Sequence, residues 1–174
     1  MITTNRIEAP GYGEVRQMAR DVIRALDIGT SATHMEWFAS PKGLRFSEIG
    51  CRPPGVAQWD VYDSANEFDL YAEWGSVLVH GHTQCAPSRR YAAGMIALRP
   101  SCDGHITGYS GLEAIQQTYG DCIVAAHFPA AGSATQAVAG GYMANAWMLV
   151  RHPDYDALRH IMNTIGETVK VHAA

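Results

Sequence analysis

Two glutamates and an arginine stand close together between residues 33 and 55, in the stretch THMEWFASPKGLRFSEIGCRPPG. Glu36 and Glu48 flank the turn signal Pro41-Lys42-Gly43, and Arg52 follows the second glutamate after four positions. Mg²⁺ commonly takes one or two carboxylates and completes its shell with water and phosphate oxygens. A guanidinium suits bidentate contact with a phosphate or a carboxylate. These residue types therefore predict a site for a magnesium nucleotide.

The neighbouring residues predict the elements that must hold these side chains. A helix is expected over Glu14–Leu26, because apolar residues recur there every three or four positions and charged residues take the other side. Extended segments are expected over Ala32–Phe38 and Leu44–Gly50, on either side of the turn. Cys51–Gly55 must be a loop, since its two consecutive prolines supply no backbone donors. The first unit is thus a helix followed by a β-hairpin.

The register of the hairpin decides whether the two glutamates meet. If the turn is a three-residue loop, Ser40 pairs with Leu44 and Glu36 lies directly opposite Glu48, with Cβ atoms roughly 5 Å apart. Two carboxylates at that distance repel each other or raise one pKa, and a divalent cation removes the penalty. The alternative is that both glutamates are solvated on an exposed face of the hairpin, with Arg52 as a neighbouring counter-ion.

The rest of the chain alternates helical and extended patterns. We expect a helix over Asn66–His80 and a polar boundary over Gln84–Arg90. Beyond the boundary, the pattern indicates strands over 91–98, 121–128 and 142–150, a short helix over 112–119, a connector over 129–141 and a last helix that starts at Pro153 and Asp154. The expected fold class is α+β, with one domain over residues 1–86 and a mixed α/β subdomain over residues 87–174.

Composition excludes several classes of function. The net charge is -4 and the basic residues are scattered, so nucleic acid is not an expected partner. No run of about eighteen apolar residues exists and the first residues lack the layout of a signal peptide, so we expect a cytoplasmic protein without a membrane partner. The four cysteines contain no CxxC pair, which favours reduced thiols over a disulfide framework or a zinc site.

The string HMEWF followed by SEIGCRPPG resembles the C-terminal half of the ATP-grasp fold, the superfamily of biotin carboxylase, carbamoyl-phosphate synthase and the carboxylate-amine ligases. This resemblance spans about residues 14–81. Beyond Tyr91 the order of strands and helices is similar to the C-terminal subdomain of L-amino acid ligase-type proteins, an analogy at the level of fold. The resemblance implies that residues 1–86 are the C-terminal half of an ATP-grasp domain.

The resemblance also implies roles for the three residues. In ATP-grasp proteins an acidic residue on each of two neighbouring strands holds Mg-ATP, and an arginine four positions after the second contacts the phosphate or acyl-phosphate end. Glu36, Glu48 and Arg52 match these positions. They would bind ATP together, both glutamates would bind Mg²⁺ or else Mn²⁺, and Arg52 would be catalytic. The loop at Gly55 would border the substrate.

The implied reaction is an ADP-forming ligation. ATP phosphorylates a substrate carboxylate to an acyl phosphate, and an amine or a thiol then displaces the phosphate. The expected partners are therefore small carboxylates and amines, with a homodimer as the candidate assembly.

The chain departs from the family pattern at two points. Many members carry Asn two residues after the second glutamate, whereas this chain has Gly50, so one metal ligand is missing or replaced by water. No Gly-rich loop with a lysine precedes Glu14, so we expect the C-terminal portion of a longer enzyme, inactive by itself. The rival is a non-catalytic binding or assembly module that retains the hairpin.

Histidines near these elements are weighed separately. His34 shares a strand face with Glu36 and either contacts the nucleotide or packs within the hairpin. His80-Gly81-His82 sits at an expected helix end without a second ligand cluster, where a histidine is favourable with the helix dipole. It is not expected to bind a metal.

Overall fold

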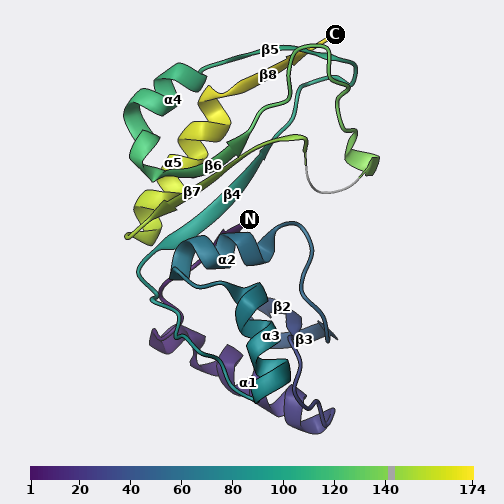
Figure 1. The fold of residues 1–174 in the computed structure, drawn as a ribbon, viewed down its shortest axis with the longest axis vertical. Helices are drawn as coiled ribbons and strands as arrows, with labels where there is room; N and C mark the ends of the chain where they lie inside the picture. The colour runs from purple at the N-terminus through teal and green to yellow at the C-terminus, as the bar shows by residue number, and fades with distance from the viewer. Residues whose placement is uncertain (141–143) are drawn as a thin grey trace.

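The fold of the chain is α+β, as the sequence predicts (Figure 1). The computed structural model describes residues 1–140 and 144–174. A four-stranded antiparallel sheet with two helices on one face forms one part of the molecule, and a hairpin with three helices forms the other. Among the described residues, no helix is both long enough and apolar enough to cross a membrane.

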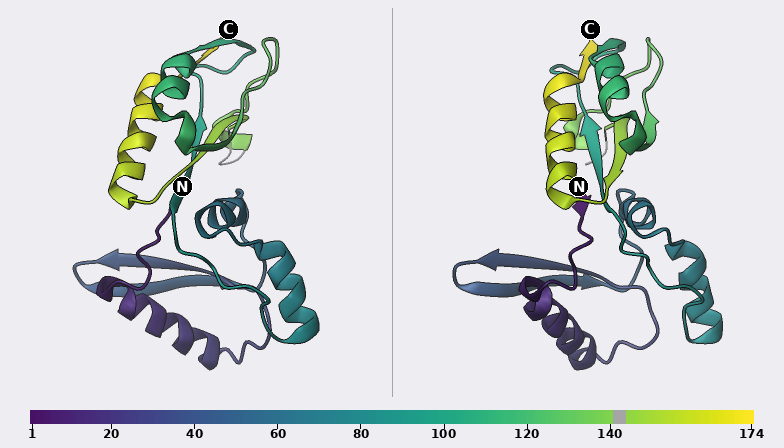
Figure 2. Two further views of the ribbon diagram at one scale, coloured as in Figure 1. Left: turned by 60° about the vertical axis from the view of Figure 1, so that its left-hand side comes forward. Right: turned by 90° about the vertical axis from the view of Figure 1, so that its left-hand side faces the viewer.

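The predicted helix and hairpin are present. Helix α1 covers Gly13–Ala25, strand β2 covers His34–Ser40 and strand β3 covers Gly43–Gly50. The loop between the strands is shorter than predicted: Ser40 pairs with Gly43, so only Pro41 and Lys42 connect them. Gly43 permits this tight turn because its φ of 93° lies in the left-handed region. Figure 2 shows the hairpin reaching away from the sheet, with α1 on one side of it.

The helix predicted over Asn66–His80 is present but starts later, and a separate helix before it was not predicted. Helix α2 covers Gln58–Asn66 and helix α3 covers Leu70–His80. The chain breaks between them because Glu67 adopts a left-handed φ of 51°, after which the Asp69 side chain caps α3 by accepting a hydrogen bond from the N–H of Ala72 at 2.9 Å. Gly81 ends α3 as expected, with φ of 76°.

The larger sheet has the strand order β1-β4-β7-β6, and every neighbouring pair is antiparallel. Its strands are β1 at Ile2–Thr3, β4 at Ala92–Leu98, β7 at Ala146–His152 and β6 at Ile123–His127. β4 and β6 agree closely with the predicted strands. The strand predicted over 142–150 starts later, at Ala146, and its residues 142 and 143 lie outside the described part.

Helices α4 (Leu112–Tyr119) and α5 (Tyr155–Thr168) were both predicted. Asp154 caps α5 by accepting a hydrogen bond from the N–H of Ala157 at 2.7 Å. A second pair of strands, β5 (Ile106–Ser110) and β8 (Lys170–Ala173), was not predicted. Three short 3₁₀ helices complete the described elements: η1 at Pro10–Tyr12, η2 at Gly120–Cys122 and η3 at Val138–Gly140.

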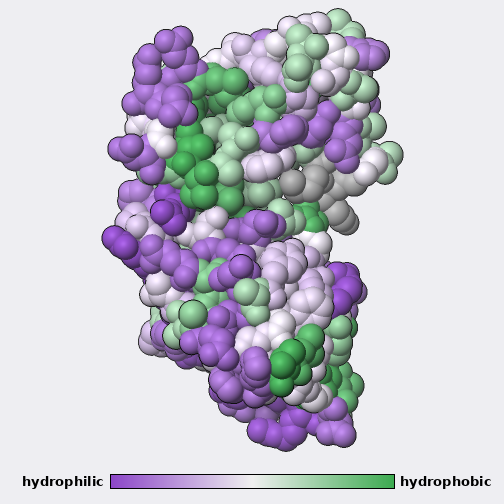
Figure 3. All heavy atoms as spheres, viewed as in Figure 1, coloured by the Kyte–Doolittle hydropathy of each residue, from purple (hydrophilic) through white to green (hydrophobic). Residues whose placement is uncertain are grey.

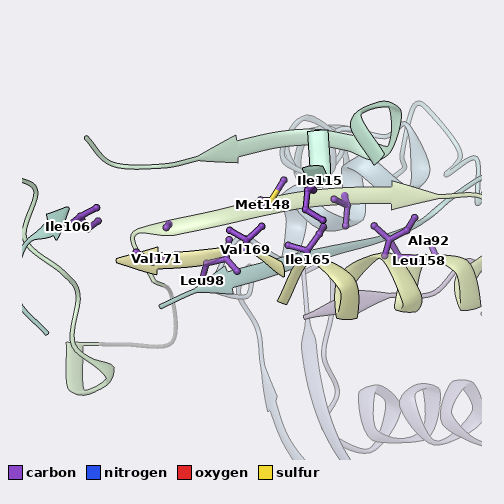
Figure 4. Packing of buried hydrophobic residues seen from close by; sticks show 12 residues of the cluster. Ala92, Leu98, Ile106, Ile115, Met148, Leu158, Ile165, Val169 and Val171 are labelled. Atoms are coloured by element: carbon purple, nitrogen blue, oxygen red, sulfur yellow. The ribbon is translucent and has the colours of Figure 1, made fainter. Parts of the chain in front are cut away.

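The main core lies between the sheet and helices α4 and α5 (Figure 4). Leu158 and Ile165 of α5 are fully buried and pack with Ala92 of β4 and Met148 of β7. Helix α2 covers the opposite face of the sheet, where Val61 and Ala65 pack with Ala93 and Met95 of β4. Helix α2 therefore links the hairpin part to the sheet.

The hairpin part has much less core of its own. Helix α1 contains no buried residue, although its apolar residues form a stripe. Leu78 and Val79 of α3 are also exposed, and Figure 3 shows apolar atoms at the surface in this lower half of the molecule. These side chains leave apolar surface uncovered by the described residues.

Candidate functional site

The register of the hairpin places Glu36 directly opposite Glu48. The predicted pairing is confirmed, but the predicted loop is not its cause. The two-residue loop pairs Trp37 with Phe46, and a β-bulge then shifts the register by one residue, so that Ser47 has no residue opposite it. A bulge re-aims the side chains that follow it in its strand. The bulge thus brings Glu48 to Glu36.

A third potential ligand lies beside the two carboxylates. His34 is on the same face of β2 as Glu36, and its Nε2 lies 3.5 Å from Glu36 Oε1. One ligand atom from each of His34, Glu36 and Glu48 can be chosen so that all three lie within 4.8 Å of one another. Within the described residues, no other group of three or more His, Cys, Asp or Glu residues lies this close together.

Both carboxylates are exposed, as the solvated alternative predicts, and no lysine or arginine of the described chain balances their charge. Among the described residues, neither Glu36 nor Glu48 forms an ion pair with a lysine or an arginine. Like charges directly opposite each other in a hairpin destabilise it. The donor set, two carboxylates and an imidazole, is one that divalent metal ions accept. The residues therefore fit a divalent cation.

Arg52 lies near this cluster without neutralising it. Its Nη1 donates a hydrogen bond to the carbonyl oxygen of Pro53 at 2.9 Å, and the side chain is exposed. In the part of the chain that the structure describes, Arg52 takes part in no ion pair. Its full positive charge is thus available to an anion. The counter-ion role weighed from the sequence is absent from these contacts.

Gly55 lies in the exposed loop that leads from β3 to α2. The two following residues, Val56 and Ala57, have φ of 59° and 55°, a conformation that is strained for a β-branched residue such as valine. Strained backbone of this kind clusters at functional sites. The carbonyl oxygen of Gly55 accepts a hydrogen bond from the N–H of Gln58 at 3.3 Å, which closes the turn before α2.

A pocket of about 650 Å³ adjoins the cluster and was not predicted. Its wall includes His34, Pro54, Gln58, Trp59 and Tyr62, so it runs from the open end of the hairpin to α2. Its lining contains no Asp, Glu, Lys or Arg. Burial raises the pKa of the Tyr62 phenol, which keeps this hydroxyl neutral. The pocket is formed by separate segments, including residues 1–3, 32–35 and 58–62, and no local pattern signals it.

The pair His80 and His82 does not join a metal site in the described chain. The Nδ1 of His82 lies 3.0 Å from the carbonyl oxygen of His80, and the two rings are 6.3 Å apart. No third ligand residue groups with them. All four cysteines are free thiols.

Comparison with known proteins places this fold. No protein-family model matches the sequence, and no curated protein matches it. Solved structures do match it. An L-amino acid ligase from Bacillus licheniformis superposes with a TM-score of 0.71 at 14% identity, covering 93% of this chain and 43% of that one. An N5-carboxyaminoimidazole ribonucleotide synthetase from Thermotoga maritima gives 0.65 at 18% identity, covering 97% and 44%.

A third match is the biotin carboxylase domain of a 2-oxoglutarate carboxylase from Hydrogenobacter thermophilus, a dimer in complex with MgADP, ADP and bicarbonate. Its TM-score is 0.63 at 17% identity, and the match covers 98% of this chain and 38% of that one. The chain therefore has a fold that occurs in ATP-grasp enzymes, as the sequence resemblance predicts. It spans less than half the length of these structures.

Proposed function

We propose that this chain is the C-terminal part of an ADP-forming ATP-grasp ligase and contributes the ligands for Mg-ATP. Residues 1–86 would complete the ATP-grasp domain, and residues 87–174 would form the C-terminal subdomain. The enzyme would join a small carboxylate to an amine or a thiol through an acyl phosphate, in the cytoplasm. The homodimer remains the candidate assembly, with a dimer among the matched structures as its support.

The direct pairing of Glu36 with Glu48, without a lysine or arginine in ion-pair contact among the described residues, carries this proposal. The two carboxylates of such a pair repel each other, and a bound cation relieves that repulsion. In the proposed site Glu36 and Glu48 hold Mg²⁺ or Mn²⁺, which, when bound, would offset the negative charge of the ATP phosphates. Since no lysine or arginine of the described residues contacts them, both carboxylates stay available to the metal.

The other site residues act on the phosphate and on the substrate. Arg52 would stabilise the transferring phosphoryl group or the acyl phosphate, since a guanidinium offers paired donors to phosphate oxygens and its charge is uncompensated in the described contacts. Gly55 would border the carboxylate substrate. We place this substrate in the adjoining pocket, whose lining lacks charged side chains, so we expect its body to be neutral. Positioning would supply much of the rate enhancement.

The test is metal-nucleotide binding to the 174-residue chain, followed by turnover in a protein that carries the whole fold. Isothermal calorimetry with Mg-ADP should give binding for the wild type and for Glu14→Gln, an exposed glutamate of α1. Glu48→Gln should remove both this binding and ADP formation. Binding and turnover that are unchanged in Glu48→Gln would refute the metal assignment.

A binding or assembly module is the second candidate function. The observation that favours it is helix α1, whose apolar stripe has no buried residue in the described chain and so offers a surface to another polypeptide. Mg-ADP binding that depends on Glu48 supports the ligase. A chain that binds no nucleotide, but co-purifies with a partner only while Leu26 of this stripe is intact, supports the module.

A further inference from the structure

We infer that His34 is the third protein ligand of this metal site, and that its imidazole shifts the site's preference from Mg²⁺ toward a first-row transition cation such as Mn²⁺. This inference rests on the proposed function, because it names a further ligand for the same ion. It concerns a residue that the two-carboxylate site does not require.

The position of His34 is the first argument. Its side chain is only 14% exposed, and it reaches the two carboxylates from the same face of the hairpin. The Nε2 atom lies 3.5 Å from Glu36 Oε1, too long for a strong charge-assisted hydrogen bond. Two ligand atoms on one ion are typically separated by about 3–4 Å, given metal–ligand distances near 2.1 Å. Little movement is therefore needed to place both groups on one cation.

The second argument is that nothing else holds the imidazole. His34 Nδ1 is buried and has no hydrogen-bond partner among the described residues. A histidine kept for packing normally has its buried ring nitrogens satisfied, because an unpaired buried polar atom is costly. A neutral imidazole keeps one nitrogen lone pair, and here neither ring nitrogen is committed to a strong hydrogen bond. The nitrogen that faces Glu36 is Nε2, so a metal ion would take the Nε2 lone pair and Nδ1 would carry the proton.

The third argument concerns the opposite strand. Gly50 pairs with His34 across the hairpin and offers no side chain, so β3 supplies no ligand at that position after Glu48. A Cβ built on Gly50 would lie 3.1 Å from His34 Nδ1, which is a tight contact. The imidazole of His34 thus occupies part of the space that a side chain at position 50 would fill. His34 is the group placed to complete the ligand set.

A nitrogen ligand changes which ion the site prefers. Mg²⁺ favours oxygen ligands and gives up its water reluctantly. Imidazole binds first-row transition metals better, with an affinity that rises from Mn²⁺ to the later metals of the row. Two carboxylates alone would suit Mg²⁺. Two carboxylates with an imidazole raise the affinity for Mn²⁺ relative to that for Mg²⁺.

The test uses Mn²⁺ alone as the probe, bound to the full 174-residue chain. Electron spin echo envelope modulation of the bound Mn²⁺ should show coupling to a directly coordinated ¹⁴N nucleus in the wild type. The coupling should vanish in His34→Gln and persist in His82→Ala, which removes an exposed histidine of another segment. Competition of Mg²⁺ against Mn²⁺, followed by the signal of free Mn²⁺, should give a lower Mn²⁺ to Mg²⁺ affinity ratio in His34→Gln. His34→Ala should weaken Mn²⁺ binding by at least about tenfold.

The outcomes separate this inference from the proposed function. Mn²⁺ that binds, is lost in Glu48→Gln and shows no ¹⁴N coupling in the wild type would overturn the role of His34 and leave the carboxylate site standing. A wild-type chain that binds neither Mn²⁺ nor Mg²⁺ would overturn both. The spectroscopic readout on the wild type needs no variant, and far-UV circular dichroism checks that His34→Ala is folded.

Discussion

Glu36 and Glu48 face each other across the hairpin because Ser47 is an extra residue in β3. With the two-residue loop and no bulge, Glu36 would pair with Ser47, and Glu48 would turn toward the other face of the hairpin. The cost of the bulge is local, whereas its effect is to bring two like charges together. The bulge creates repulsion between the two carboxylates in the isolated hairpin, and a bound cation would turn that repulsion into a favourable arrangement.

The first prediction follows from this repulsion. In a buffer free of divalent cations, Glu48→Gln should stabilise the chain by up to about 1 kcal/mol, since it removes a like-charged cross-strand pair. Saturating Mn²⁺ should reverse the order: at 100 times its dissociation constant, a ligand that binds only the folded state stabilises it by about 2.7 kcal/mol. Urea unfolding with and without Mn²⁺ measures both effects, with Glu14→Gln as the matched control. Equal stabilisation of the wild type and Glu48→Gln by Mn²⁺ would contradict it.

The second prediction concerns the start of α4. Gly111 has φ of 81°, and a Cβ at this position would lie 2.3 Å from the carbonyl oxygen of Thr168. Gly111→Ala must therefore shift backbone and also carries the left-handed penalty of about 1–2 kcal/mol, so we expect a loss of at least that size. Gly75→Ala is the control, because its Cβ would meet nothing within 4 Å inside helix α3 and should stabilise by about 0.5–1 kcal/mol. Equal thermal stability of the two variants would rule out the close approach.

The third prediction contrasts two leucines. Leu158 of α5 is fully buried in the main core, and Leu26 at the end of α1 is 56% exposed. Leu158→Ala should cost about 2–5 kcal/mol, because it leaves a cavity. Leu26→Ala should change the free energy of unfolding by less than about 0.5 kcal/mol. A large loss from Leu26→Ala would show that this side chain is packed in solution, against the exposure seen in the structure.

The fourth prediction is a pH dependence at Asp154. The hydrogen bond from the N–H of Ala157 holds the pKa of this carboxyl below its ordinary value of 3.8, with Arg6 helping. A lowered folded-state pKa gives stability that is complete above the ordinary pKa and is lost as the pH falls through the lower one. Asp154→Asn keeps the cap without the charge. The wild type should have the higher urea midpoint at pH 7, and the difference should shrink as the pH falls below 3.8. A difference that grows in acid would reverse the sign and refute the assignment.

Much of the fold could be predicted from local patterns. Helices α1 and α4 follow from apolar residues at helical spacing, and β4 and β6 follow from short apolar segments. Helix α2 was missed because its N-cap is Ala57 in a left-handed conformation, whereas sequence rules look for Ser, Thr, Asp or Asn. Strands β5 and β8 were missed because they are short and pair only with each other, across about sixty residues of chain.

The site was predicted in part. The predicted pairing of the two glutamates was correct although the predicted loop was one residue too long. The shorter loop shifts the register by one residue, and the bulge shifts it back. No local rule signals that bulge. The lack of a partner for His34 Nδ1, and its contact with Gly50, depend on how the finished hairpin packs. The pocket depends on segments from separate parts of the chain, so only the assembled fold defines it.

The pairing of β1 with β4 has a topological consequence. Thr3 lies beside Ala93, and Met1 exchanges backbone hydrogen bonds with Met95, so residues 4–91 leave the sheet and return to it at neighbouring strands. The hairpin, α1, α2 and α3 are therefore an insertion between two adjacent strands. Both ends of that insertion are anchored, so a single break inside it leaves the pieces held to one sheet. The candidate site therefore lies on a closed loop whose two ends are fixed on neighbouring strands of the sheet.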